Sequence, residues 1–420
     1  MRKYFNNPDF QGVVIVTIGT YVAAFFSYLF QFFLGRLLSI EDYGLFNAYL
    51  AISYILGVPS YVLSTSLVKY VASLSGKHDF KKLSTMYRKF QFITVLFGFI
   101  IGALIVIFRE PMSAYLKSGS NELTILYGLV IAFSYIIIVP FAYLQGYLRY
   151  RSYSLSNIVE GFSRFLFPVA LLFFGLGLSG VFVGLVISAI VTYFVSRILL
   201  SRNLKQLESV DTMGEYSKLF IYSFPVLFIN LALILLNNID LILVKKLFSS
   251  TDAGYYAGTV TLGKILLFGS STIGSVMFPR LANEYSKGKN FTKTFLFFFI
   301  LQVLVVGIGT LAFCTLPGLF TNLFFGHKFE GSILYLPSFS IFVAFYVLFN
   351  FLIMFFLAIE KTYIYLLLVP AVILQYFLLS NAHSITQVIT INTYITGALF
   401  VVLLLLSVFA LSTVHKNKTI

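Results

Sequence analysis

Four ionisable side chains lie inside long apolar stretches of the sequence, where a charge is costly. Glu160 and Arg164 lie in the first half of the chain, and Asp240 and Lys264 lie in the second. Charged groups at membrane depth usually face a cavity or a partner, so such positions mark functional sites. Lysine and arginine bind anions, and the arginine fork matches the oxygen atoms of a phosphate. These residue types therefore point to a cavity that accepts an anionic substrate, with Lys264 as an anion contact.

Asp240 follows two asparagines near the end of its apolar run. One interpretation is an acid in the cavity that pairs with a cation such as Lys264, or that carries a proton or a sodium ion. The other is an interfacial acid paired with Lys245 or Lys246. We predict an ion-coupling or charge-pairing role for Asp240 and a substrate contact for Asn237, and the sequence leaves both interpretations of Asp240 open.

Glu160 and Arg164 are four residues apart, the spacing of neighbours on one helix face. They could form an intrahelical salt bridge near the cytoplasmic interface. They could also belong to a cytoplasmic gate together with Arg149 and Arg151, whose side chains would then contact phosphate. We include all four residues in the predicted site, with Glu160 as a charge-pairing residue.

The first apolar segment carries a polar stripe of Thr17, Thr20, Ser27 and Gln31, which fall within about 80° at 100° per residue. Such a stripe faces a polar lumen, although hydroxyl side chains also form hydrogen bonds between helices. We assign Gln31 to the lumen. Arg36 ends this segment and either points inward as a substrate contact or marks the outer interface.

Several classes of function are excluded by missing motifs. The chain has no Walker A, GxSxG, HExxH or EF-hand pattern, and it carries one cysteine, Cys314. The histidines are scattered along the chain: His78, His327, His383 and His415. We therefore expect no metal, no cofactor and no enzymatic activity. The net charge of +14 comes from basic residues in short links, which argues against nucleic-acid binding.

The elements that position these residues are membrane helices. The 420 residues are 59% hydrophobic and 10% charged, whereas soluble domains carry about 25% charged residues. Unbroken apolar runs exclude the alternating pattern of a membrane barrel. Prolines recur inside the runs, and each of them can kink its helix. They are Pro59, Pro140, Pro168, Pro225, Pro337 and Pro370. We predict about twelve helices, at 12–35, 44–71, 90–108, 122–148, 156–175, 180–200, 219–245, 254–278, 294–315, 331–358, 362–380 and 388–411.

Lysine and arginine are unevenly distributed between alternate links, which predicts orientation. Most of them lie on the side of the two termini. The opposite side holds only Arg36, Arg109, Lys117, Lys245, Lys246 and Lys328. Basic residues favour the cytoplasmic side of a membrane. We therefore expect a multi-pass protein of the cell (plasma or inner) membrane with both termini in the cytoplasm.

The two halves of the chain resemble each other at a constant offset. Residues 36–46 match residues 246–256 at an offset of 210, and residues 151–153 match residues 361–363 at the same offset. We therefore predict two six-helix bundles, 1–210 and 211–420.

An even number of helices per half gives two parallel repeats, which would enclose a central cavity and allow alternating access. An ancient duplication that serves only as a scaffold is the competing interpretation.

Short motifs resemble those of the polysaccharide repeat-unit (O-antigen type) flippases of the multidrug/oligosaccharidyl-lipid/polysaccharide exporter superfamily. The motifs are Phe224-Pro225, Asn238-Ile239-Asp240-Leu241, Asp252-Ala253-Gly254-Tyr255-Tyr256, Gly35-Arg36-Leu37-Leu38, Glu41-Asp42-Tyr43-Gly44-Leu45-Phe46 and Pro279-Arg280-Leu281. The resemblance implies two six-helix bundles with a cationic lumen and a substrate built on a polyprenyl (pyro)phosphate that carries a short glycan. It implies Arg36, Arg164 and Lys264 as cationic contacts and Asp240 as the acidic residue.

We therefore expect a flippase for a lipid-linked oligosaccharide that acts as a monomer in membrane lipid, with a glycan polymerase or glycosyltransferases as partners and without nucleic acid. The alternative is a drug or metabolite antiporter of the same superfamily, driven by a proton or sodium gradient. A membrane-bound glycosyltransferase is a third class, which would need acidic catalytic loops that do not stand out.

Overall fold

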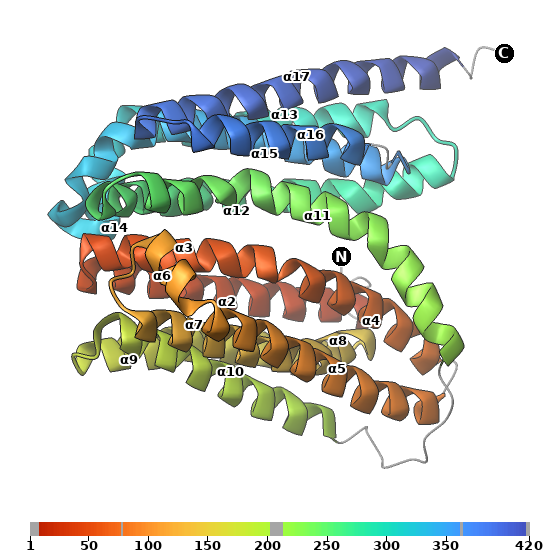
Figure 1. The fold of residues 1–420 in the computed structure, drawn as a ribbon. Coiled ribbons are helices and arrows are strands. Elements are labelled where there is room, and N and C mark those ends of the chain that lie inside the picture. The colour runs from red at the N-terminus through yellow and green to blue at the C-terminus, as the bar shows by residue number, and fades with distance from the viewer. Residues whose placement is uncertain (1–7, 77–78, 202–212, 362–363, 417–420) are drawn as a thin grey trace. The chain divides into compact units, whose positions relative to one another are not determined.

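The computed structural model describes residues 8–76, 79–201, 213–361 and 364–416, and these residues form helices and no strands (Figure 1). Ten of the helices are long and apolar enough to cross a membrane, or eleven if one bent pair counts as a span. The shorter apolar helix Leu366–Ser380 adds a further candidate. Each of the twelve predicted segments coincides with one of these helices, which confirms the all-α membrane fold class.

The chain divides into two compact units. The N-terminal unit comprises Met1–Leu38 and Ser53–Leu227, and the C-terminal unit comprises Ser39–Ile52 and Phe228–Ile420. A single boundary at residue 210 would divide the chain differently at two helices. The first part of α3 (Ile40–Leu56) belongs to the C-terminal unit, and the first part of α11 (Met213–Leu247) belongs to the N-terminal unit.

The remaining helices each lie within one unit. Those of the N-terminal unit are α2 (Pro8–Leu37), α4 (Val58–Gly76), α5 (Phe80–Ile107), α6 (Arg109–Leu116), α7 (Asn121–Ser134), α8 (Ile138–Gly146), α9 (Tyr150–Phe173) and α10 (Gly177–Ser201). Those of the C-terminal unit are α12 (Ser250–Ser286), α13 (Thr292–Thr315), α14 (Pro317–Phe325), α15 (Glu330–Ala358), α16 (Tyr365–Ser380) and α17 (Ile385–Lys416).

Small residues let α2 and α9 pack closely in the N-terminal unit. A side chain on Gly19 would collide with Ser154, and one on Gly161 would lie 2.8 Å from the backbone of Ala23. The Ser154 hydroxyl donates to the carbonyl of Ile15 at 3.0 Å. Lipid supplies no hydrophobic force between helices, so close backbone approach and interhelical hydrogen bonds hold such pairs together. This contact fixes which face of α9 points toward α2.

Two proline positions explain breaks within spans. The α3–α4 pair bends by 44° next to Pro59. Between α7 and α8, residues Tyr135–Ile137 form a 3₁₀ turn ahead of Pro140. Pro140 cannot donate to the carbonyl of Ile136, four residues earlier, and the Gln91 side chain donates to that carbonyl instead at 3.1 Å. A bend thus accompanies Pro59 and a 3₁₀ turn precedes Pro140, whereas α9, α15 and α16 continue through the prolines that they contain.

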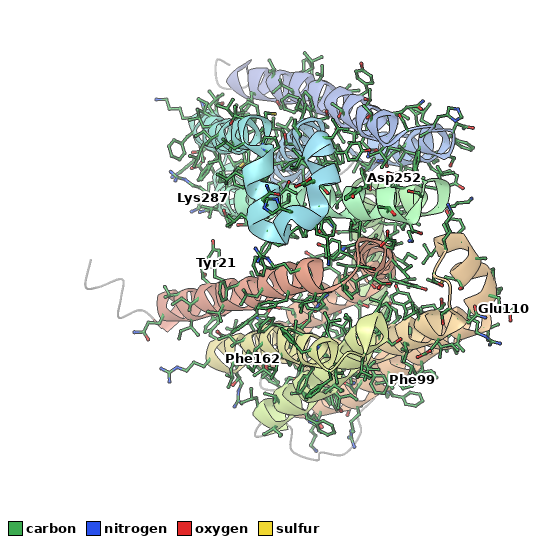
Figure 2. All side chains as sticks on the ribbon, turned by 90° about the vertical axis from the view of Figure 1, so that its left-hand side faces the viewer. Tyr21, Phe99, Glu110, Phe162, Asp252 and Lys287 are labelled. Atoms are coloured by element: carbon green, nitrogen blue, oxygen red, sulfur yellow. The ribbon has the colours of Figure 1, made fainter. Side chains whose placement is uncertain are left out.

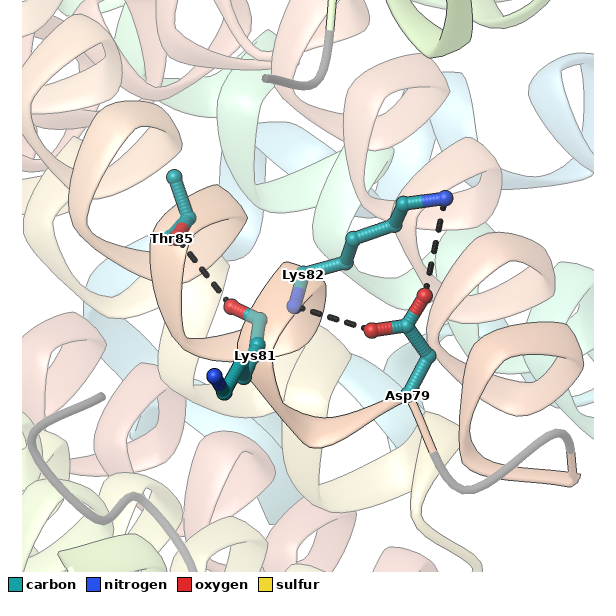
Figure 3. A network of polar contacts seen from close by, with 4 residues as sticks. All are labelled: Asp79, Lys81, Lys82 and Thr85. Atoms are coloured by element: carbon teal, nitrogen blue, oxygen red, sulfur yellow. Dashed lines mark hydrogen bonds and ion pairs between the residues drawn. The ribbon is translucent and has the colours of Figure 1, made fainter. Parts of the chain in front are cut away.

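Helix α5 begins ten residues before the predicted start at residue 90, because its first turns are capped and amphipathic. The Asp79 carboxylate accepts the backbone N–H of Lys82 at 3.2 Å and lies 3.5 Å from the Lys82 ammonium group (Figure 3). Such a cap satisfies an N–H group that has no partner within the helix. Leu83 and Tyr87 are buried in the first turns, so this polar-looking segment still packs on the core.

Repeat-related residues of α3 and α12 contact each other inside the C-terminal unit. The Thr251 hydroxyl donates to the Glu41 carboxylate at 2.6 Å, across 210 residues of sequence. A side chain on Gly44 would lie 2.8 Å from the Cα of Gly254, its counterpart at the same offset. The two helices thus meet around the positions that the sequence repeat equates, and they meet backbone to backbone.

We predict that Gly44→Leu destabilises the protein by about 1–3 kcal/mol, the usual cost of overpacking, because the facing Gly254 backbone cannot yield. Thermal unfolding of the purified protein in detergent measures this loss. Gly307→Leu on α13 is the matched control, since a side chain there meets no atom within 4 Å. Equal melting temperatures for the two variants would contradict the close contact.

Candidate functional site

Helix α9 presents Glu160 and Arg164 away from its exposed apolar face. Leu155, Phe162 and Leu166 are 46%, 42% and 39% exposed, and at about 100° per residue they share one face of the helix. Phe162 is labelled in Figure 2. Glu160 and Arg164 each lie two residues from Phe162, which places them about 200° around the helix at 100° per residue. Both side chains are half-buried. Their position therefore agrees with a polar interior rather than with contact to acyl chains.

Glu160 and Arg164 do not form the salt bridge that their spacing allows. No ion pair joins them, and neither side chain has a hydrogen-bond partner among the residues that the structure describes. A half-buried guanidinium group without a carboxylate partner keeps its donors available. Arg164 is therefore able to bind an anion bidentately.

Arg149 and Arg151 lie apart from this pair. The Arg149 guanidinium donates to the carbonyl of Leu199 on α10 at 3.2 Å. Arg151 is exposed and lies about 140° around α9 from Arg164, on the side of Leu155. The structure thus does not place the two arginines on the face of Glu160 and Arg164.

The polar stripe of α2 is largely accessible. Thr17 and Thr20 are exposed, and Gln31 is half-buried. Ser27 donates to the carbonyl of Ala23 in its own helix at 3.0 Å. Arg36 is exposed, with its guanidinium carbon 4.4 Å from the centroid of the Phe32 ring, a cation–π contact. Thr17, Thr20 and Gln31 could thus contact a polar substrate.

In the C-terminal unit, Asp240 is the centre of a buried hydrogen-bond network. Asp240 is 1% exposed. Its carboxylate accepts the Tyr256 hydroxyl, and it accepts the Asn392 amide at 3.0 Å. Gln375 donates to Asn392 at 2.9 Å and to the carbonyl of Leu236 at 3.0 Å. Four helices, α11, α12, α16 and α17, are joined by these contacts.

The network gives Asp240 partners that the sequence did not indicate. The hydrogen bonds to its carboxylate come from the Tyr256 hydroxyl, the Asn392 amide and the backbone N–H of Leu241. Lys245 is itself 1% exposed and donates to the Ser250 hydroxyl at 3.2 Å, so it is a buried residue and not an interfacial one. The hydrogen-bond donors to Asp240 are neutral, and Lys264 attracts its carboxylate electrostatically. A role for Asp240 in charge pairing or ion coupling remains a prediction.

Sequence reasoning missed Tyr256, Gln375 and Asn392. The signal was present for two of them, because Gln375 and Asn392 are amides inside apolar runs, where an unpaired polar group is costly. Tyr256 gave no such signal, since tyrosine is common at membrane interfaces.

Lys264 lies on an accessible face of α12 that also carries hydroxyl groups. Its ammonium group donates to the Asn238 side chain at 3.2 Å, and it is half-buried. Ser271 and Ser275 fall within about 20° of it around the helix, and both are exposed. Phe268 on the same face is exposed as well. Asn237 on α11 is half-buried, and no contact with Lys264 is seen for it.

The fold is similar to several solved transporter structures. An inward-facing multidrug resistance MATE family transporter of the MOP superfamily has a TM-score of 0.77 at 12% identity, covering 96% of this chain and 99% of that one. The lipid II flippase MurJ has a TM-score of 0.70 at 15% identity, covering 94% and 87%. A MOP superfamily transporter from Pyrococcus furiosus has a TM-score of 0.65 at 11% identity, covering 96% of each chain. Together with the apolar helices, these similarities define the class, a multi-pass membrane protein with the twelve-helix fold of the MOP superfamily transporters.

A match to a sequence family classifies the chain more narrowly than the fold does. The family described as polysaccharide biosynthesis protein matches residues 10–284, and the chain belongs to this family. The resemblance inferred from the short motifs is thereby confirmed. A search of curated proteins finds no match.

We predict that Asp240→Leu lowers stability more than Asp240→Asn. Leucine leaves the Tyr256 hydroxyl and the Asn392 amide unpaired, at about 1–3 kcal/mol each, whereas asparagine keeps one acceptor oxygen. Melting temperatures in detergent compare the two variants. If the leucine variant melts no lower than the asparagine variant, the network does not stabilise the C-terminal unit.

Proposed function

We propose that the protein flips a polyprenyl-(pyro)phosphate-linked oligosaccharide from the cytoplasmic to the outer leaflet by alternating access, for the synthesis of a polysaccharide or other glycan. Membership of the polysaccharide biosynthesis family supports a glycan pathway. The single observation that carries the proposal is that Arg164, half-buried opposite the exposed apolar face of α9, makes no hydrogen bond or ion pair with any residue that the structure describes.

The chemistry of such a substrate matches the residues at these faces. Hydrocarbon excludes a phosphate, so a crossing phosphate needs cationic donors along its route. Arg164 would supply a bidentate contact and Lys264 a compact charge. Sugar hydroxyls would exchange water for partners such as Thr17, Gln31 and Ser271. The polyprenyl tail would remain within the hydrocarbon of the bilayer, so moving it from one leaflet to the other would cost no desolvation free energy.

The location and the energy source are part of the proposal. The side with most lysine and arginine residues would face the cytoplasm, which places both termini there and the protein in the cell membrane. The sequence contains no nucleotide-binding motif, so we propose that an ion gradient, the membrane potential or the substrate gradient drives transport. Asp240 is the proposed coupling residue if an ion is used.

We expect deletion of the gene to trap lipid-linked glycan in the cytoplasmic leaflet, because the phosphate cannot cross unaided. The measurement is protection of the glycan from an impermeant glycan-oxidising reagent added outside the cell. Normal labelling in the deletion strain would contradict the flippase proposal. Normal glycan export in the deletion strain, together with lost resistance to cationic drugs, would instead favour an antiporter.

Arg164→Gln and Lys264→Ala should each reduce transport about tenfold or more, since a hydrogen bond to a charged group contributes about 1.5–3 kcal/mol and 1.4 kcal/mol is a factor of ten. Complementation of the deletion strain at matched protein level measures this. Lys289→Gln, at an exposed position after α12, is the control and should transport normally. Full activity of both site variants would remove Arg164 and Lys264 from the substrate path.

A further inference from the structure

A hollow of about 310 Å³ lies in the N-terminal unit where α9 begins beside the start of α2. It is lined by Gln11, Gly12 and Ile15 of α2 and by residues 148–152 of the link into α9. Its volume is near the lower end of the usual range for small-ligand sites, about 300–1,000 Å³. The hollow lies at helix ends on the side of the chain that carries most of the lysine and arginine residues.

The local backbone shapes this hollow. Leu148 adopts φ 56°, a left-handed conformation that turns the chain sharply between α8 and α9. A side chain on Gly12 would collide with the Tyr150 ring, so glycine lets this ring lie against α2. The link is also tied to the rest of the unit, because Arg149 donates to the carbonyl of Leu199.

The lining is positively charged. Arg151 is exposed and makes no hydrogen bond or ion pair with any residue that the structure describes. Arg149 lies beside it and remains anchored on α10. The first residues of α9, a helix of 24 residues, also line the hollow, and no side chain caps them. Two guanidinium groups next to free backbone N–H groups favour an anion with several oxygen atoms.

The hollow lies on the exposed apolar face of α9 and not on the face of Arg164. Arg151 lies on the same helical face as Leu155 and Phe162, which are 46% and 42% exposed. Leu148, which lines the hollow, is 59% exposed. At a helix end on this side of the membrane, the anions that lie beside such a surface are lipid phosphates.

We propose that this hollow binds the phosphate of a lipid headgroup in the leaflet on the lysine- and arginine-rich side of the membrane. Arg151 holds the phosphate, and Arg149 and the start of α9 complete the site. Either an anionic phospholipid or the carrier phosphate of the proposed substrate supplies this group. The inference needs only the membrane location of the helices and does not depend on the proposed flippase activity.

Native mass spectrometry of the purified full-length protein, titrated with phosphatidylglycerol and separately with a polyprenyl phosphate, tests the site. We expect Arg151→Gln to weaken binding of the first lipid about fivefold, the change that corresponds to about 1 kcal/mol for one basic residue near a lipid surface. Arg151→Lys should retain most of the binding. The matched control is Lys287→Gln, which replaces an exposed cation just after the end of α12 (labelled in Figure 2) that does not line the hollow.

The two lipids distinguish the source of the phosphate. Loss of both on Arg151→Gln identifies a general headgroup site, and loss of the polyprenyl phosphate alone identifies an entry site for the carrier. The proposal is overturned if neither lipid binds less tightly, or if Lys287→Gln weakens binding as much. Unchanged melting of the Arg151 variants excludes misfolding. Because the readout is lipid binding, it stands whether or not the deletion strain accumulates glycan.

Discussion

Hydrocarbon offers no hydrogen-bond partner, so every polar group that this chain carries into the membrane must be satisfied by the protein or by water in a cavity. The α7–α8 span shows the constraint at one atom. Pro140 removes the donor that the carbonyl of Ile136 would have used, and Gln91 of another helix supplies it. The Asp240 network shows the same constraint for a buried carboxylate, which accepts hydrogen bonds from the Tyr256 hydroxyl and the Asn392 amide.

The same constraint gives meaning to the polar groups that lack such partners. Arg164 and Glu160 are close in sequence and on one helix face, yet they form no ion pair. Each would be costly in contact with lipid, and both lie opposite the exposed apolar face of α9. Arg151 belongs to the same helix but lies near its end and on the exposed face. One helix thus carries two kinds of cation with two different surroundings.

Close packing depends on residues that have almost no side chain. Gly19 and Gly161 bring α2 against α9, and this contact sets the direction of every other residue on α9. Gly44 and Gly254 do the same for α3 and α12. The latter pair occupies equivalent positions of the two sequence halves, as does the hydrogen-bonded pair of Thr251 and Glu41. The 210-residue offset that is visible in the sequence therefore reappears as a physical contact.

The sequence by itself determined that the chain lies in a membrane, that it forms helices there and which family it belongs to. It could do so because apolar runs, interrupting prolines and short motifs are local properties of the chain. It also located Arg164, Asp240 and Lys264 as residues that need an explanation. Only the tertiary structure decided what surrounds them. A buried carboxylate takes its partners from helices more than a hundred residues apart, as Asp240 does with Asn392, and no local pattern specifies that pairing. The surroundings of a side chain likewise depend on which face of its helix packs. Helix periodicity separates Arg151 from Arg164 by about 140°, but only the docking of α9 on α2 and α10 decided that Arg151 is exposed and Arg164 is half-buried.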